Sequence, residues 1–245
     1  MGVYLYPNNT ETELKNAYIG EYPERWQPWA NTVAYYPLTS TTTVNDLSGN
    51  GYTLSTHDTL PTFWIYQWVD CASFNSNSLK TSSVNPWAYW NYFTVSLWIY
   101  STSNWDRVPI CNYYAQIEWW PIWYNWGIRS HSSWSSIFKL MWGSNPTFNL
   151  NSGTTWWNHL LFIWDNWNLI TYKNGVQQGT GTIGSVNNNG TLTIWAWWDD
   201  WEAHEWHGCF WYFKWWISEV IIEDKVRTAR EIADYYNLTK SNYGL

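Results

Sequence analysis

Tryptophan supplies 26 of the 245 residues, and many of these stand where the neighbouring residues are typical of turns. The acidic and polar segment 194–208 contains five of them, namely Trp195, Trp197, Trp198, Trp201 and Trp206. Turns need residues that tolerate a positive φ, which glycine adopts readily and large aromatic residues seldom adopt. Bulky apolar rings therefore occupy positions where a β-protein usually has glycine.

Four tryptophan doublets raise a second conflict. They are Trp119-Trp120, Trp156-Trp157, Trp197-Trp198 and Trp215-Trp216. Successive side chains of a strand point to opposite faces, so a half-buried sheet covers one ring of a pair and leaves the other in water. Each uncovered ring exposes on the order of 150–250 Å² of apolar surface. We therefore expect that these doublets do not all bury both rings.

We hypothesise that many of these tryptophans are glycines in the natural protein, encoded by UGA in a genome that decodes this codon as glycine. With glycine, Asp165-Asn-Trp-Asn168 becomes Asp-Asn-Gly-Asn between two apolar runs, which is a hairpin signal. The 14 written glycines are already a normal share, so composition alone does not decide. The alternative is a genuinely tryptophan-rich protein that stacks sugars on its indoles.

Two tryptophans lie in runs that are typical of core strands. Trp98 is part of the apolar and β-branched run 93–100, and Trp157 precedes the run 158–163. We expect both rings to be deeply buried. The predicted core also contains Tyr172, Ile217 and Val220. In contrast, we expect loop positions, several of them exposed or at positive φ, for Trp119, Trp120, Trp123, Trp197, Trp198, Trp201 and Trp206.

Short strand-like runs alternate with turn clusters from Thr32 onward, which is typical of an all-β sandwich. The strongest strand candidates are Thr32–Tyr36, Cys71–Phe74, Tyr92–Tyr100, Val108–Tyr113, Ile137–Met141, Trp157–Ile163, Leu169–Lys173, Thr191–Ile194 and Ile217–Ile222. One helix is predicted over Thr228–Tyr236, since Thr228 and Glu231 form a capping box. We therefore expect two packed antiparallel sheets with this short C-terminal helix against them.

The sequence predicts two regions, an N-terminal arm and one β-domain. Residues 1–30 show little periodicity and contain Pro23 and Pro28, so we expect an arm that packs poorly on the domain and attaches it to something else. Residues 31–240 form the predicted β-domain. The sequence as written shows neither a signal peptide nor an apolar run of about 18 residues, so we expect no membrane span.

Charge and cysteine content narrow the function classes. The net charge is −7, only 13% of the residues are charged and no Lys/Arg cluster occurs, which argues against nucleic-acid binding. Cys71, Cys111 and Cys209 are widely spaced, without a C-x-x-C motif. We expect three buried thiols, with one disulfide and a free thiol as the alternative.

Six segments precede the helix in a specific order. They are Val33–Leu38, Asn45–Tyr52, Phe93–Tyr100, Trp157–Leu160, Leu169–Val176 and Phe213–Ile222. Their succession resembles the laminin G-like branch of the concanavalin A-like lectin/glucanase superfamily over about residues 32–238. The resemblance implies a jelly-roll sandwich of two antiparallel sheets. It also places glycine at Trp195 and Trp215 and keeps tryptophan at Trp98 and Trp157, in line with the recoding hypothesis.

A few carboxylates are candidates for the catalytic residues of a glycoside hydrolase. A glucanase on such a sheet needs two carboxylates that face one groove, and the strand-borne candidates are Glu118 and the pair Glu219 and Glu223. The resemblance implies an acidic residue at Glu219 in non-enzymatic members, so we expect a structural hydrogen-bonding role and no catalytic residue. Asp46 is expected to cap the bend at residues 48–51 as an Asx-type turn.

The acidic segment supplies the candidate ligand-binding residues, Asp199, Asp200, Glu202, His204 and Glu205. Closely spaced oxygen ligands suit Ca²⁺, with Asp199, Asp200 and Glu202 as its candidates, whereas the histidines of the segment suit a transition metal. The spacing matches no defined metal-binding loop. A solvated segment without an ion is therefore the favoured interpretation, and no cofactor is expected.

We expect a non-enzymatic, lectin-like domain that binds a glycan or a cell-surface partner, as an appendage of a virion tail or a cell-surface assembly. Oligomerisation, or attachment to a larger assembly, is expected through the N-terminal arm. The missing signal peptide, the arm and the alternative genetic code favour the virion. Because one fold hosts many functions, two alternatives stand: a structural decoration domain without ligand, and a glucanase-type glycoside hydrolase.

Overall fold

The computed structural model describes most of the chain from residue 31 onward. The described residues are 31–56, 59–74, 79–81, 92–101, 107–114, 123–131, 135–138, 147–148, 156–182, 191–196 and 215–245. The N-terminal arm, residues 1–30, lies outside them. Its poor packing on the domain therefore stays a prediction.

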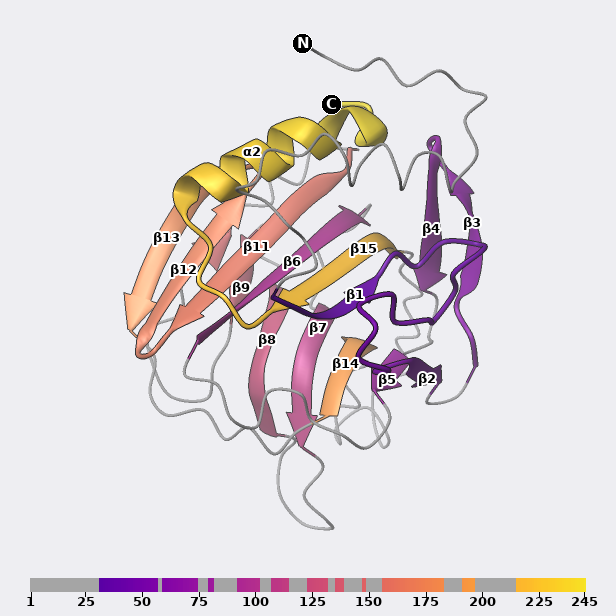
Figure 1. Ribbon diagram of the computed structural model, residues 1–245, viewed down its shortest axis with the longest axis horizontal. Coiled ribbons are helices and arrows are strands. Elements are labelled where there is room, and N and C mark those ends of the chain that lie inside the picture. The colour runs from indigo at the N-terminus through magenta and orange to yellow at the C-terminus, as the bar shows by residue number, and fades with distance from the viewer. Residues whose placement is uncertain are drawn as a thin grey trace, which may run out of the picture.

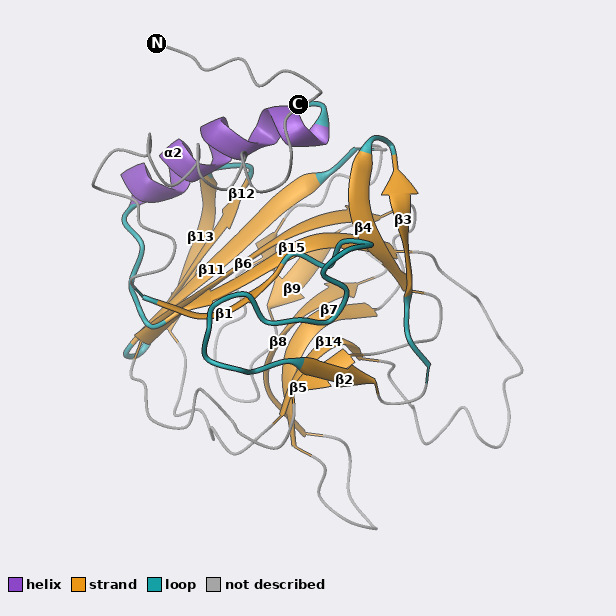
Figure 2. Ribbon diagram, turned by 45° about the vertical axis from the view of Figure 1, so that its right-hand side comes forward, coloured by secondary structure: helices purple, strands orange, loops and turns teal. Residues whose placement is uncertain are grey.

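The described strands form two antiparallel sheets that pack face to face (Figures 1 and 2). The eight-stranded sheet runs β13-β12-β11-β6-β15-β4-β3, and β1 also pairs with β15. Its strands are β1 Thr32–Tyr36, β3 Thr62–Tyr66, β4 Val69–Phe74, β6 Tyr92–Ser101, β11 Asn158–Asp165, β12 Asn168–Lys173, β13 Val176–Thr182 and β15 Trp215–Glu223.

The seven-stranded sheet runs β10-β9-β8-β7-β14-β5-β2. Its strands are β2 Leu54–Thr56, β5 Leu79–Thr81, β7 Arg107–Tyr114, β8 Trp123–His131, β9 Ser135–Phe138, β10 Thr147–Phe148 and β14 Thr191–Ala196. The predicted all-β sandwich is thus confirmed. Neighbouring strands in both sheets run antiparallel, as in the pairing of β6 with β11 and of β7 with β14.

Each of the nine predicted strands overlaps a strand of the structure. The least accurate is Ile137–Met141, because β9 begins earlier, at Ser135, and residues 139–141 lie outside the described part. Six strands were not predicted, namely β2, β3, β5, β8, β10 and β13. The expected loop position of Trp123 is wrong, since Trp123 begins β8. The remaining loop tryptophans of that set lie outside the described residues.

The side chains on the two faces of β6 pack into two different hydrophobic clusters. Phe93, Val95, Leu97 and Ile99 point between the sheets, where they join Leu79, Ile110 and Ile194 of the other sheet. Trp98 and Tyr100 point to the outer face and pack with Trp157, Trp216 and Tyr243. The expected burial of Trp98, Trp157, Tyr172, Ile217 and Val220 is confirmed. However, the two tryptophans belong to this outer layer and not to the inter-sheet core.

Helix α2, Ala229–Thr239, covers the outer face of the eight-stranded sheet (Figure 1). The Thr228 hydroxyl accepts the backbone N–H of Glu231 at 3.2 Å, and the Glu231 carboxylate accepts the Thr228 N–H at 2.8 Å. The predicted capping box is therefore confirmed, although the helix ends at Thr239, beyond the predicted Tyr236. Within the described residues, no helix is long and apolar enough to cross a membrane.

Helix α2 buries its apolar side on the strands beneath it. Ile232 packs with Leu161, Ile163 and Tyr172 of β11 and β12. The helix continues into the 3₁₀ helix η2, Lys240–Tyr243, whose Tyr243 ring stacks on Trp98 with a centroid distance of 3.8 Å. The buried Arg227 guanidinium pairs with the buried Glu223 carboxylate, which ties the end of β15 to the start of the helix.

Removal of the helix cap should weaken the whole domain, because α2 covers one sheet face. We expect Thr228→Ala to lower the free energy of unfolding by about 1 kcal/mol in urea titrations. Thr228→Asn keeps a capping oxygen and serves as the matched control, with most of the stability retained. Equal losses in both variants would contradict the capping role.

Candidate functional site

A bulge in β15 places Glu219 at the meeting point of three elements. Against β6, Ile217 pairs with Ile99 and Val220 with Leu97, so β15 holds one extra residue between these pairs. Bulges of this kind redirect side chains. The Glu219 carboxylate accepts hydrogen bonds from the hydroxyls of Tyr35 in β1, at 3.1 Å, and Tyr235 in α2.

Glu219 has an unusual affinity for protons. Burial raises the pKa of its carboxyl to about 7, and the hydrogen bond from Tyr35 opposes this rise. The residue is only partly buried, so a part of it still contacts solvent. Burial disfavours the charged form of a carboxyl group, and donor hydroxyls favour it. A carboxyl with such a pKa titrates near neutral pH, which makes it a candidate functional group as well as a structural one.

His159 lies close by on β11 under the same helix. Its Nε2 lies 2.7 Å from the Ser96 hydroxyl, and its ring centroid lies 5.1 Å from those of Trp98 and Tyr235. The residue is fully buried, and desolvation lowers its pKa to about 3. The imidazole is therefore neutral at physiological pH, and its burial keeps it away from a dissolved substrate.

The geometry of Glu219 and Glu223 favours structural roles. Glu219 is bonded to two tyrosines and Glu223 to Arg227, so each carboxylate is engaged with protein groups. Both lie where helix α2 and its leading segment pack on the sheet, not in an open groove. The expected structural role of Glu219 is thus supported by its hydrogen bonds. The other strand-borne candidate, Glu118, lies outside the described residues.

Asp46 organises the loop between β1 and β2, as expected. One carboxylate oxygen accepts the backbone N–H groups of Tyr35 and Ser48, at 3.0 and 2.9 Å, and the other accepts that of Tyr52 at 3.0 Å. The amide of Asn50 donates to the carbonyl of Val33 at 2.9 Å. The loop thereby occupies hydrogen-bonding groups along the free edge of β1.

The predicted ligand-binding residues belong to the acidic segment. Asp199, Asp200, Glu202, His204 and Glu205 lie outside the described residues, so their role in binding a ligand or Ca²⁺ stays a prediction. Across the described ranges, no group of three or more His, Cys, Asp or Glu residues is arranged to hold a metal ion. Cys71 is buried with a free thiol, as expected, whereas the side chains of Cys111 and Cys209 are not described.

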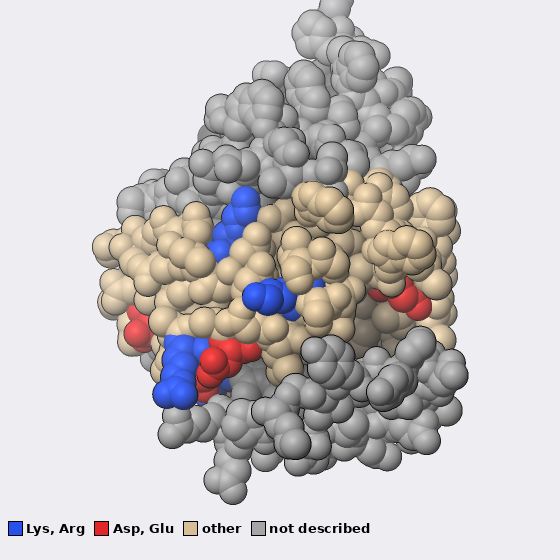
Figure 3. All heavy atoms as spheres, turned by 90° about the horizontal axis from the view of Figure 1, so that it is seen from above, with Lys and Arg blue, Asp and Glu red and all other residues tan. Residues whose placement is uncertain are grey.

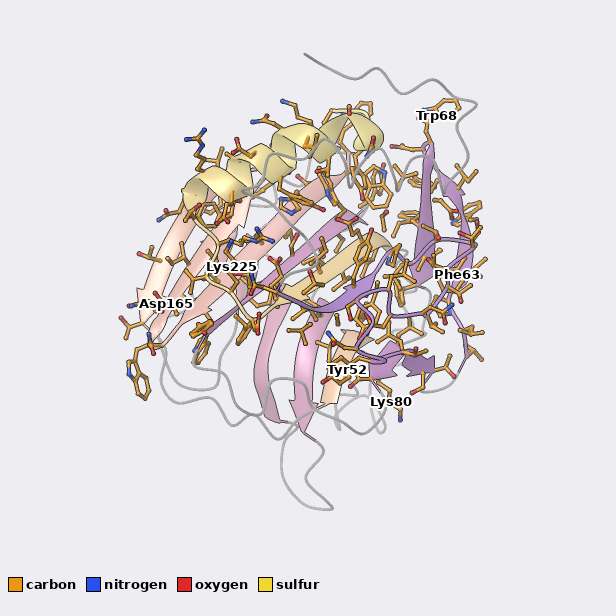
Figure 4. All side chains as sticks on the ribbon, viewed as in Figure 1. Tyr52, Phe63, Trp68, Lys80, Asp165 and Lys225 are labelled. Carbon is orange, nitrogen blue, oxygen red and sulfur yellow. The ribbon has the colours of Figure 1, made fainter. Side chains whose placement is uncertain are left out.

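Exposed aromatic rings gather at the β3–β4 hairpin. Trp68 stands at its tip (Figure 4). Its side chain is 94% exposed, and Trp64 of β3 is 47% exposed. The Trp156-Trp157 doublet behaves as expected, with one ring exposed and the other buried. In Figure 3, which shows the helix-bearing side, charged side chains are few among the described residues, and at one edge basic and acidic side chains lie against each other. Exposed rings and a sparsely charged surface are compatible with a carbohydrate ligand.

The turn at Trp68 has a close counterpart in the same chain. Gln67 and Trp68 link the paired residues Tyr66 and Val69 with φ angles of 45° and 72°. Asn174-Gly175 links β12 to β13 in the same way, with φ angles of 52° and 76°. Two-residue hairpins with positive φ at both positions favour Asn-Gly. Trp68 therefore occupies the position that glycine holds in the second hairpin.

No family model matches the chain, and no curated protein is similar to it in sequence. Solved structures share its fold. The binding domain of Paraclostridial Mosquitocidal Protein 1 is 14% identical over 86% of this chain and 53% of its own, with a TM-score of 0.64. The binding domain of botulinum neurotoxin DC in complex with SialylT is 14% identical over 86% and 52%, also with a TM-score of 0.64.

A third similar structure concerns botulinum neurotoxin type C, whose cell entry is described as dependent on interaction with two ganglioside molecules. It is 16% identical over 84% of this chain and 51% of its own, with a TM-score of 0.61. The chain thus spans about half of each of these three structures. At such identities the likeness establishes the fold alone.

Glu219 and His159 should make the free energy of unfolding change with pH in opposite directions. The pKa of Glu219 is raised from 4.5 to about 7, so its contribution is complete below pH 4.5 and is lost as the pH rises to 7. The pKa of His159 is lowered from 6.5 to about 3, so its contribution is complete above pH 6.5 and is lost as the pH falls to 3. Between pH 4.5 and 6.5 the two slopes cancel.

We therefore expect Glu219→Gln to replace the flat profile between pH 4.5 and 6.5 with a rise in stability on the order of 3 kcal/mol, because only the His159 slope remains. Urea titrations across this range measure it. Asp234→Asn, at an exposed position of α2, is the control and should leave the profile unchanged. An unaltered profile in Glu219→Gln would show that folding does not shift the pKa of this carboxyl.

Proposed function

We propose that this chain is a non-enzymatic, glycan-binding β-sandwich domain. The observation that carries the proposal is the shared fold: 86% of the chain superimposes on half of a binding domain described in complex with SialylT. A second structure with the same fold is described through its interaction with gangliosides. Both descriptions name ligands that contain sugars, so a glycan is the ligand class that the fold favours most.

The engagement of Glu219 and Glu223 favours binding over hydrolysis. Glycoside hydrolysis needs one carboxyl group to protonate the leaving oxygen and a second to attack or to activate water. Here the two carboxyl groups are held by Tyr35, Tyr235 and Arg227 beneath or beside helix α2. Neither is positioned to reach a sugar without loss of those hydrogen bonds.

We further propose that the domain is displayed on a virion tail or a cell-surface assembly, where a glycan or cell-surface ligand is accessible. Asp199, Asp200 and Glu202 of the acidic segment are the proposed ligand-binding residues, without a bound ion, and Ca²⁺ is the alternative that their oxygen atoms would suit. A structural decoration domain is the competing proposal, and it requires no ligand.

Glycan binding is tested with the full chain on a glycan array that includes sialylated structures, with and without EDTA. We expect binding to a restricted set of glycans and no release of reducing sugar from β-glucans. EDTA sensitivity would implicate the acidic segment. Absence of binding to every glycan would favour the decoration domain, and release of reducing sugar would establish the hydrolase.

We also propose that position 68 is glycine in the natural protein, as expected if UGA encodes glycine in its genome. The similar two-residue turn at Asn174-Gly175 supports this, as does the 94% exposure of Trp68. A left-handed backbone costs a residue with a side chain roughly 1–2 kcal/mol. Glycine avoids that cost but loses more backbone entropy on folding, about 0.5–1 kcal/mol.

We therefore expect Trp68→Gly to raise the free energy of unfolding by about 0.5–1 kcal/mol in urea titrations. The matched control is Trp98→Gly, which should lose at least about 3 kcal/mol because Trp98 is fully buried. Intact mass from the native host should fall below 29.2 kDa. A native mass of 29.2 kDa would refute the recoding and favour sugar stacking on the exposed indoles.

A further inference from the structure

In the described part of the chain, every sheet edge but one has a feature that hinders pairing with a strand of another molecule. Strands β10 and β2, at the two ends of the seven-stranded sheet, have two and three residues. The free edge of β1 is covered by the Asp46 loop. Terminal strand β13 has a bulge, because Thr171 pairs with Gly179 and the next residue, Tyr172, with Gln177. Short strands, bulges and covering loops are the known means of preventing edge association.

Strand β3, Thr62–Tyr66, is the terminal strand at the other end of the eight-stranded sheet, and among the described residues it has none of these features. All five residues pair with β4 in unbroken register. Its sequence, Thr-Phe-Trp-Ile-Tyr, has high β-propensity, and no charged residue occurs from position 59 to 69. Ile65 is 67% exposed and Trp64 47%. An apolar, regular and uncharged edge of this kind is a site of strand association.

We propose that β3 pairs antiparallel with β3 of a second copy of this chain, about a two-fold axis at Trp64. In this register, Phe63 of each copy lies opposite Ile65 of the other, and Thr62 lies opposite Tyr66. Aromatic and β-branched residues directly opposite each other stabilise antiparallel pairs. The two eight-stranded sheets become one continuous sheet, and the Ile65 side chains leave water.

A second copy fits this edge better than an unrelated strand. The sequence is self-complementary about Trp64, so one set of contacts is made twice, as in closed two-fold dimers. The chain carries a net charge of −7, yet the contact strand carries none, so the like charges of two copies do not meet there. Phe63 and Ile65 carry the pairing, so it does not require tryptophan at positions 64 or 68.

The two exposed aliphatic residues of the terminal strands provide a matched pair of variants. Ile65 in β3 and Val176 in β13 are 67% and 63% exposed. Sedimentation equilibrium of the full chain should give twice 29.2 kDa. Ile65→Lys places a charge in the contact and should give 29.2 kDa, whereas Val176→Lys should stay dimeric. A monomeric wild type, or dissociation by Val176→Lys alone, would overturn the proposal.

Amide hydrogen exchange of the unmodified chain gives a readout that no folding defect can imitate. Exchange at Thr62–Tyr66 should slow as the protein concentration rises, whereas exchange in β13 should not change. Concentration-independent exchange in β3 would overturn the proposal. A dimer with unprotected β3 amides would do the same, since it would use a different surface, such as the N-terminal arm.

Discussion

The fold depends on the docking of the C-terminal helix on the outer face of the eight-stranded sheet. In a simple sandwich, only the inner face of each sheet is buried, but β6 and β11 here are buried on both faces. Tyr243 stacks on Trp98, and Tyr235 donates to Glu219, so the helix contributes rings and hydrogen bonds to one layer. Residues 215–245 thus supply both a central strand and its cover.

The outer layer is stable despite unsatisfied polar groups. The indole N–H groups of Trp98, Trp157 and Trp216 are buried without a hydrogen-bond partner within the described structure. An unpaired buried donor costs roughly 1–3 kcal/mol. Covering 150–250 Å² of ring surface at about 25 cal/mol per Å² contributes roughly 4–6 kcal/mol. Ring burial therefore outweighs the lost hydrogen bonds, and large aromatic residues are tolerated in this layer.

The elements that bury apolar side chains could be predicted from the sequence. The β6 run and the Thr228 capping box carry local signals, and both were predicted. Strand β13, with two glycines and mostly exposed residues, carries no alternation because an edge strand need not bury a face. The structural role of Glu219 was expected, but its hydrogen-bond partners could not be predicted from the sequence. Its partner Tyr35 lies 184 positions away, and alternation does not tell which sheet face a helix will cover.

Energetics limit how many of the 26 tryptophans can stand at glycine positions in a folded protein. A left-handed backbone at a bulky residue costs roughly 1–2 kcal/mol, and among the described tryptophans only Trp68 has a positive φ. A domain is stable by only about 5–15 kcal/mol. The same strain at ten positions would consume that margin. A chain that carries tryptophan throughout must therefore hold most of its indoles in ordinary backbone conformations, whereas a chain with glycine at these positions is free of this limit.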